Sequence, residues 1–129
     1  MAILALLISA CTMVGHEKVA GWPDLQTFEH YVPNDQMRDR CSKYVAFGMS
    51  PEACAEFSLA ANRCDIWLSA DFPPAKWVVE HERLHCKGYD HIGMNTMARL
   101  LARHRGAAGG EVASTGGDFA STGATAPTR

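Results

Sequence analysis

The chain has 129 residues, a length that fits one domain, and its 47% hydrophobic and 20% charged residues are typical of a globular protein with a packed core. The formal net charge is −2, and acidic and basic residues are mixed along the sequence. There is no basic stripe of the kind that binds nucleic acid and no acidic block that would form a solvating tail, so we expect no nucleic-acid partner.

The first ten residues, MAILALLISA, form an apolar run that ends at Cys11. This run is too short to cross a bilayer as a helix, which needs about 20 apolar residues. It has the length of the hydrophobic region of a signal peptide. A buried N-terminal strand or helix is the alternative interpretation.

The tetrapeptide Ile-Ser-Ala-Cys that ends at Cys11 resembles the lipobox of bacterial lipoproteins. The resemblance implies that residues 1–10 are a signal peptide and that Cys11 carries a lipid. Thr12 stands where a retention signal for the inner membrane would have Asp. The implied location is therefore the periplasmic side of the outer membrane, with Cys11 as the membrane anchor.

Four cysteines remain if Cys11 is lipidated. They are Cys41, Cys54, Cys64 and Cys86. An even number of cysteines in a short exported chain predicts two disulfides, whose connectivity has three possibilities. Four reduced, buried cysteines in a cytosolic protein are the alternative, against which the apolar N-terminus argues.

The segment after the anchor, residues 11–33, contains two prolines, and we expect it to be a linker with at most a weak helical period. Asn34 is a favourable N-cap for a helix over 35–47, which Gly48 can end. This helix would open the folded domain.

Two stretches with a period of two residues follow, at 53–59 and 64–69. Joined by a short connection, they predict an antiparallel hairpin. The first stretch is rich in alanine and follows Ser50-Pro51-Glu52, which can start a helix. A helix over 53–61 therefore remains the alternative to the first strand.

A pair of prolines can then open a helix over 75–87, because proline is tolerated in the first helical turn. Gly88 suits the left-handed position that follows a helix. A last helix is predicted at 94–104. The remaining residues, 105–129, are mostly Gly, Ala, Ser and Thr with two copies of ASTG, and we expect them to be disordered.

A cluster of metal-ligand residues lies in the helix over 75–87 and just after it. His81 and His85 are four residues apart, so they project from one helix face and can bind one tetrahedral zinc ion. Gly88 turns the chain so that His91 can return as the third ligand. Asp90 is the alternative third ligand, or it orients a ligand histidine from outside the ligand set.

The pattern H-E-x-x-H-x-x-G-x-x-H over residues 81–91 resembles the zinc-binding motif of the metzincin metallopeptidases, and every fixed position of it is present. The resemblance implies a zinc ion and Glu82 as the general base that activates a metal-bound water. It implies hydrolysis of a peptide bond in a peptide or protein substrate. It further implies that the strand at 64–69 lies along the cleft and pairs with the extended substrate.

The predicted fold is a small α+β, zincin-like domain over residues 34–104, in which the antiparallel hairpin packs on the metal-binding helix between flanking helices. A non-catalytic, metal-binding envelope lipoprotein that acts as a structural or interaction module is the alternative function. Structural zinc sites are closed by four protein ligands, whereas catalytic sites keep an open position. The other histidines, His16, His30 and His104, are not spaced along the sequence as metal ligands are, and we expect them to be solvated.

The hairpin register predicts the disulfide pairing. With Leu59 opposite Cys64, the apolar face of the hairpin contains Cys64 and covers the metal-binding helix, which carries Cys86. Cys54 then lies on the opposite face by the period of two, which leaves Cys41 of the first helix as its partner. We therefore predict the pairs Cys64–Cys86 and Cys41–Cys54.

Overall fold

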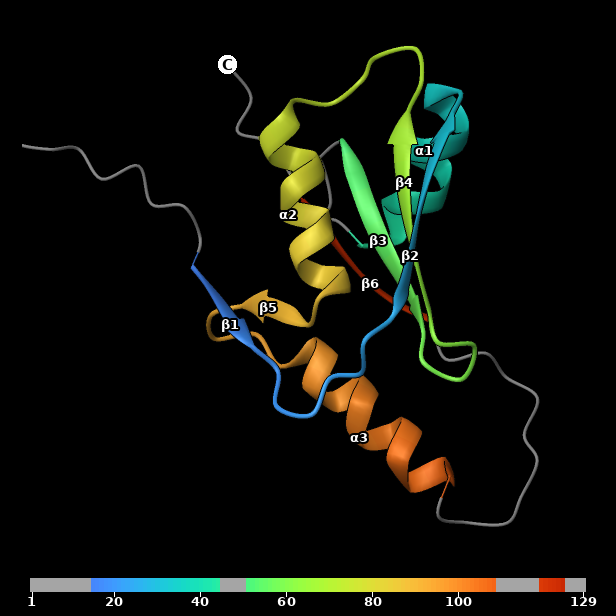
Figure 1. The fold of residues 1–129 in the computed structure, drawn as a ribbon. Helices are drawn as coiled ribbons and strands as arrows, with labels where there is room; N and C mark the ends of the chain where they lie inside the picture. Colours follow the sequence, from blue (N-terminus) through green and yellow to red (C-terminus); the bar gives the residue numbers. More distant parts are fainter. Residues whose placement is uncertain (1–14, 45–50, 109–118, 125–129) are drawn as a thin grey trace, which may run out of the picture.

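The computed structural model describes residues 15–44, 51–108 and 119–124, which form three α-helices and two sheets (Figure 1). The larger sheet has the strand order β2-β4-β3-β6, and the smaller sheet pairs β1 with β5. The strands are β1 His16–Lys18, β2 Gln26–Val32, β3 Ala53–Ser58, β4 Arg63–Ser69, β5 Tyr89–His91 and β6 Phe119–Ala124. The helices are α1 Asn34–Cys41, followed by the 3-10 turn η1 Ser42–Tyr44, then α2 Lys76–Cys86 and α3 Thr96–Ala108. The predicted α+β class is confirmed.

The predicted hairpin forms from β3 and β4, which pair antiparallel. Its register differs from the prediction by two residues, since Phe57 and not Leu59 lies opposite Cys64. The turn uses Leu59 and Asn62, with the Asn62 amide donating to the Leu59 carbonyl at 3.2 Å. Asn62 adopts a φ of 53°, which asparagine tolerates better than most residues. A shift of two residues leaves every side chain on its predicted face.

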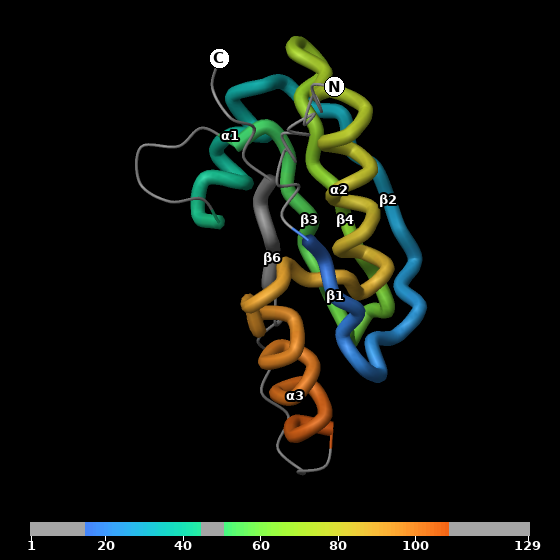
Figure 2. The backbone as a smooth tube through the Cα atoms, turned by 90° about the vertical axis from the view of Figure 1, so that its left-hand side faces the viewer, coloured from blue at the N-terminus to red at the C-terminus, as the bar shows by residue number. Residues whose placement is uncertain are grey.

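The two faces of the larger sheet pack against different helices. On one face the hairpin residues Ala55, Phe57 and Ile66 join a core with α2 and α3 that includes Val78 and Leu100. The other face packs against α1, with a second cluster of Met37, Cys41 and Cys54. The sheet therefore lies between α1 on one side and α2 with α3 on the other (Figures 1 and 2).

The N-terminal end of α1 differs from the prediction. Pro33 occupies the N-cap, and its carbonyl accepts from the Met37 amide at 3.0 Å. Asn34 is the first helical residue, and its amide donates to the Asp71 carboxylate at 2.8 Å, so an acid from a distant loop caps this helix. The α-helix ends at Cys41 and continues only as a 3-10 turn to Tyr44, earlier than the predicted end at 47. Gly48, expected to end the helix, lies outside the described residues.

The region expected to be a linker contains strands. Within residues 15–33 the chain forms β1 and β2, and β2 pairs parallel with β4. The apolar residues with a weak helical spacing do not share a helix. Trp22 and Leu25 are buried side chains of a loop, whereas Tyr31 lies on β2 and is 54% exposed. The Thr, Phe, Tyr and Val residues of β2 favour strands, and that local signal could have found it.

The C-terminal region also departs from the expectation of disorder. Helix α3 begins at Thr96 and continues to Ala108, and Met94 lies before it, 54% exposed. Residues 119–124, which include the second ASTG copy, form β6 and pair antiparallel with β3. Small residues are weak strand formers, but β3 offers a row of backbone donors and acceptors that a partner strand must satisfy.

No helix in the described part of the chain is long and apolar enough to cross a membrane. The predicted signal peptide over 1–10 and the lipidation of Cys11 lie outside the described residues, so both stay predictions.

Candidate metal centre

Helix α2 presents two histidines of the predicted site. It buries Val78, Val79 and Cys86 against the sheet. The spacing of four residues places His81 and His85 one turn apart, and their Nε2 atoms are 3.1 Å apart. Such close approach of two ring nitrogens suits a shared metal ion, which both rings can coordinate through Nε2.

His91 returns to the same volume through the turn after α2. Gly88 adopts a φ of +90°, and a Cβ atom there would lie 2.6 Å from the Trp22 ring. Glycine is therefore required both by its backbone conformation and by the close approach of Trp22. Strand β5 follows at once, and the Nε2 atom of His91 lies 3.1 Å from that of His81.

A fourth histidine, His16, joins the cluster, although the sequence analysis expected it to be solvated. Strand β1 pairs antiparallel with β5 so that His16 lies opposite His91. The centroid of the His16 ring is 4.7 Å from that of His81 and 5.1 Å from that of His91. The sequence carried no spacing signal for His16, because strand pairing and not helical periodicity brings it to the site.

The four histidines form a group that could hold a metal ion. Each offers one ring nitrogen, and these nitrogens all lie within 4.8 Å of one another. The His16 Nε2 atom is buried and has no hydrogen-bond partner among the described residues, so coordination of a metal ion would satisfy it. Imidazole ligands suit zinc and also copper, nickel and iron, so the donor set fits a transition metal without selecting one.

Burial favours the neutral form of His81, His85 and His91. It lowers the pKa of His85 to about 3, helped by the nearby His81 and opposed by the Tyr89 carbonyl. It lowers the pKa of His81 to about 4, with further lowering from His91 and His16. The pKa of His91 is lowered by burial and by His16. Neutral imidazole is the form that binds metals, so the site is ready for an ion at neutral pH.

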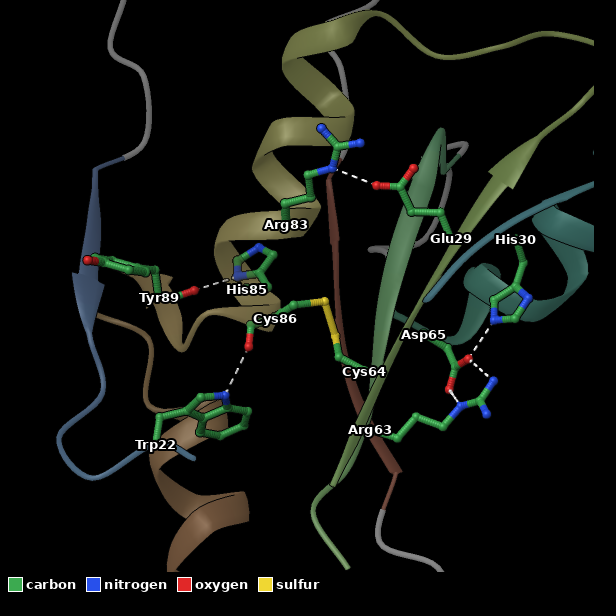
Figure 3. The surroundings of a disulfide bond; sticks show 10 residues. All are labelled: Trp22, Glu29, His30, Arg63, Cys64, Asp65, Arg83, His85, Cys86 and Tyr89. Atoms are coloured by element: carbon green, nitrogen blue, oxygen red, sulfur yellow. Dashed lines mark hydrogen bonds and ion pairs between the residues drawn. A yellow bond between two sulfur atoms is a disulfide. The ribbon is translucent and has the colours of Figure 1, made fainter. Parts of the chain in front are cut away.

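A backbone contact fixes the orientation of His85. Its Nδ1 atom lies 2.6 Å from the Tyr89 carbonyl, to which it donates (Figure 3). The proton is thereby placed on Nδ1, and the lone pair of Nε2 faces the other histidines. A histidine held in this way by a carbonyl is typical of metal ligands.

Asp90 has a structural task at the site. Its carboxylate accepts from the His91 amide at 2.8 Å and from the Met97 amide at 3.1 Å, so it caps the N-terminus of α3. It also lies 4.0 Å from the His91 Nδ1 atom. This position suits the second of the two predicted roles, the orientation of His91, better than that of a direct ligand.

Glu82 is fully buried within α2, next to His81 in the sequence. Burying a carboxylate costs free energy unless other groups compensate for the lost hydration, so such a residue is seldom placed in a core without a task.

The disulfide Cys64–Cys86 holds the metal-bearing helix to the sheet (Figure 3). Trp22 packs beside it and donates from Nε1 to the Cys86 carbonyl at 3.3 Å. The second disulfide joins Cys41 to Cys54 on the other face of the sheet. Both pairs are those that the sequence predicted, because the register shift of two residues preserved the faces.

The expected substrate-binding role of residues 64–69 is contradicted. Strand β4 lies between β2 and β3, so both of its edges are already paired. Arg83, which bonds Glu29 of β2, lies on the side of α2 facing that strand, whereas His85 faces β5 (Figure 3). A peptide added to the sheet at β2 would therefore not lie beside the histidines.

The two remaining histidines lie outside the cluster. His30 is not simply solvated, because its Nε2 atom lies 2.5 Å from Asp65 and its ring stacks on Trp67. His104 is half-buried on α3.

The fold and the site together define a small, disulfide-linked α+β protein with a four-histidine cluster able to hold a metal. No protein family matches the chain, and no curated protein or solved structure is detectably similar to it.

Proposed function

We propose that the chain is a zinc-dependent peptide hydrolase in which His81, His85 and His91 hold the metal and Glu82 is the general base. The convergence of the three Nε2 atoms carries this proposal: those of His85 and His91 each lie 3.1 Å from that of His81. Such a reaction requires three neutral imidazoles and a carboxylate; His81, His85 and Glu82 lie on α2, and His91 lies on β5.

When bound, zinc supplies a Lewis acid that makes water more acidic and polarises a carbonyl group. The chain supplies the rest. The carbonyl of Tyr89 holds the His85 ring in the metal-binding tautomer, and Asp90 orients His91. Glu82 takes a proton from the attacking water and returns it to the leaving amine.

His16 favours a second candidate, a non-catalytic metal-binding protein. A fourth imidazole in the cluster could close the coordination sphere, and a site closed by four protein ligands is structural. In that case the metal would fasten β1 to α2 and β5, and the protein surface would serve as an interaction module of the cell envelope.

Lipidation of Cys11 would place the metal centre at the membrane surface. Cys11 precedes His16 by five positions, which span at most about 18 Å when fully extended. We propose that the protein works on the periplasmic side of the outer membrane, on substrates within that reach. Changing Cys11 to Ser should release the protein from membranes, and a mature protein that retains Met1 would contradict the anchor.

Cleavage of an unstructured protein such as casein by the zinc-loaded protein tests the hydrolase. Glu82→Gln removes the base, so cleavage should fall by about 10²–10⁴-fold while zinc stays bound at about one equivalent. Glu80→Gln is the matched control, since Glu80 is exposed on the same helix and bonds Arg83. Equal cleavage by Glu82→Gln and the parent would exclude Glu82 as the base.

A further inference from the structure

We propose that His16 is the exchangeable fourth ligand of the metal centre, and that an oxygen-donor ligand such as a peptide carbonyl or a hydroxamate replaces it. This inference rests on the proposed metal centre at His81, His85 and His91. It accounts for features of both candidate functions. The coordination sphere is closed when His16 binds the metal, as in a structural site, and open when His16 is displaced, as in a catalytic site.

The four histidines differ in how firmly they are held. His81 and His85 belong to α2, which the disulfide at Cys86 ties to the sheet, and His85 is also bonded to the Tyr89 carbonyl. His91 is adjacent to the buried Asp90, which caps α3. By contrast, the buried Nε2 atom of His16 has no hydrogen-bond partner among the described residues. Unlike the His85 ring, the His16 ring is therefore not held by a hydrogen bond at its buried nitrogen.

The strand pairing explains why His16 covers the cluster. The Ile92 amide donates to the Gly15 carbonyl at 2.9 Å, and the Val19 amide donates to the Gly88 carbonyl at 2.8 Å. Antiparallel pairs alternate between hydrogen-bonded and non-hydrogen-bonded, so the His16–His91 pair falls in a non-hydrogen-bonded position, where side chains are closest. The His16 ring thus meets the His81 ring edge-on, at an interplanar angle of 71°.

Exchange requires only that the His16 side chain rotates. The bonds at both ends of β1 involve backbone atoms and stay intact when the ring turns about its Cα–Cβ bond. His16 is half-exposed, and the other two residues of β1, Glu17 and Lys18, are exposed. The ring can therefore turn toward solvent on the outer side of the molecule, where β1 lies (Figure 2).

The cobalt-substituted protein provides a direct test, because the visible absorption of Co²⁺ reports its ligands. We compare the full chain with His16→Ala, with His16→Gln, and with His104→Ala as a control for loss of a half-buried histidine elsewhere. Each protein is titrated with cobalt and then with acetohydroxamate. His16→Ala should retain about one metal equivalent, change the cobalt spectrum and bind acetohydroxamate about tenfold more tightly or better, because the internal competitor is gone.

Three outcomes would overturn the proposal. An unchanged cobalt spectrum in His16→Ala and His16→Gln would show that His16 is not a ligand. Loss of all metal from both variants would show that His16 is an essential structural ligand. Equal binding of acetohydroxamate by parent and variants would show that His16 does not compete for the position.

Peptide cleavage separates this inference from the proposed hydrolase. If His16→Ala binds acetohydroxamate more tightly and also cleaves casein faster than the parent, both proposals are supported. If binding tightens but no variant cleaves casein, His16 is exchangeable and the hydrolase proposal fails.

Discussion

Two clusters of polar side chains, one on the α1 face of the larger sheet and one beside α2, differ in the groups that they bring together. On the α1 face, acids meet cations of the same chain: Arg63 bonds Asp65 at 2.6 Å, and Arg40 and Lys43 lie 3.5 and 3.7 Å from Glu56. Beside α2 and the small sheet of β1 and β5, four histidines each offer one ring nitrogen, and these nitrogens all lie within 4.8 Å of one another. The acids on the α1 face therefore have cations of the same chain as partners, whereas the histidine cluster beside α2 offers ligands for a cation from outside.

The pKa shifts follow this division. Burial raises the pKa of Asp65, but hydrogen bonds from Arg63 and His30 outweigh it and hold that pKa below its ordinary value, so the charged form is favoured. Burial lowers the pKa values of His81 and His85, so the neutral form is favoured. The surroundings thus favour the charged form of the acid in the ion-pair network, and in the histidine cluster the neutral form, which is able to bind a metal.

The largest effect should come from removing a firmly held ligand. His85→Ala should weaken zinc binding by more than about 100-fold, since loss of residues that only support ligands already costs about 10–100-fold. Competition with a chromophoric chelator measures this. His30→Ala, on the α1 face, should bind zinc like the parent, and an equal loss in both variants would erase the distinction between the faces.

Removing either disulfide should have a smaller effect than removing a ligand, and the two disulfides should affect different properties. Replacing both Cys64 and Cys86 by Ala should lower zinc affinity about tenfold or more, because α2 is then less firmly positioned. Replacing both Cys41 and Cys54 should lower the free energy of unfolding by about 2–4 kcal/mol and leave zinc affinity unchanged. Urea unfolding and chelator competition on both variants give the two quantities. Similar zinc affinities in the two variants would contradict the positional role of Cys64–Cys86.

The smallest effect concerns pH on the α1 face. Because the pKa of Asp65 is lower in the folded state, its contribution to stability is present above the unfolded value near 3.8 and is lost as the pH falls through the folded pKa. The melting temperature of Asp65→Asn should therefore lie below that of the parent at pH 7, and the difference should shrink below pH 3.8. Both proteins are measured with chelator present. A difference that stays constant with pH would argue against the ion pair.

Sequence patterns predicted those helices, strands and turns that depend only on residues close together along the chain. The helix that carries His81 and His85, the turn at Gly88 and the hairpin all follow from periodicity and turn residues. The disulfide pairs survived an error in register because side-chain faces repeat every two residues.

Long-range pairing accounts for what was missed. Strands β1, β2 and β6 each pair with a partner far along the chain, and β1 and β6 have little strand-forming character of their own. His16 was missed for the same reason, because only the pairing of β1 with β5 brings it to His81. A single sequence carries no periodicity or turn signal for the pairing of strands that lie so far apart along the chain.

Strand β6 has a practical consequence for anyone who shortens the chain. Its low-complexity sequence is typical of a dispensable tail and invites a cut after Ala108. Such a cut would uncover the long edge of β3, in which the first five of six residues are buried. An apolar strand with a free edge recruits strands from other molecules, so the trimmed protein would be prone to aggregate during expression.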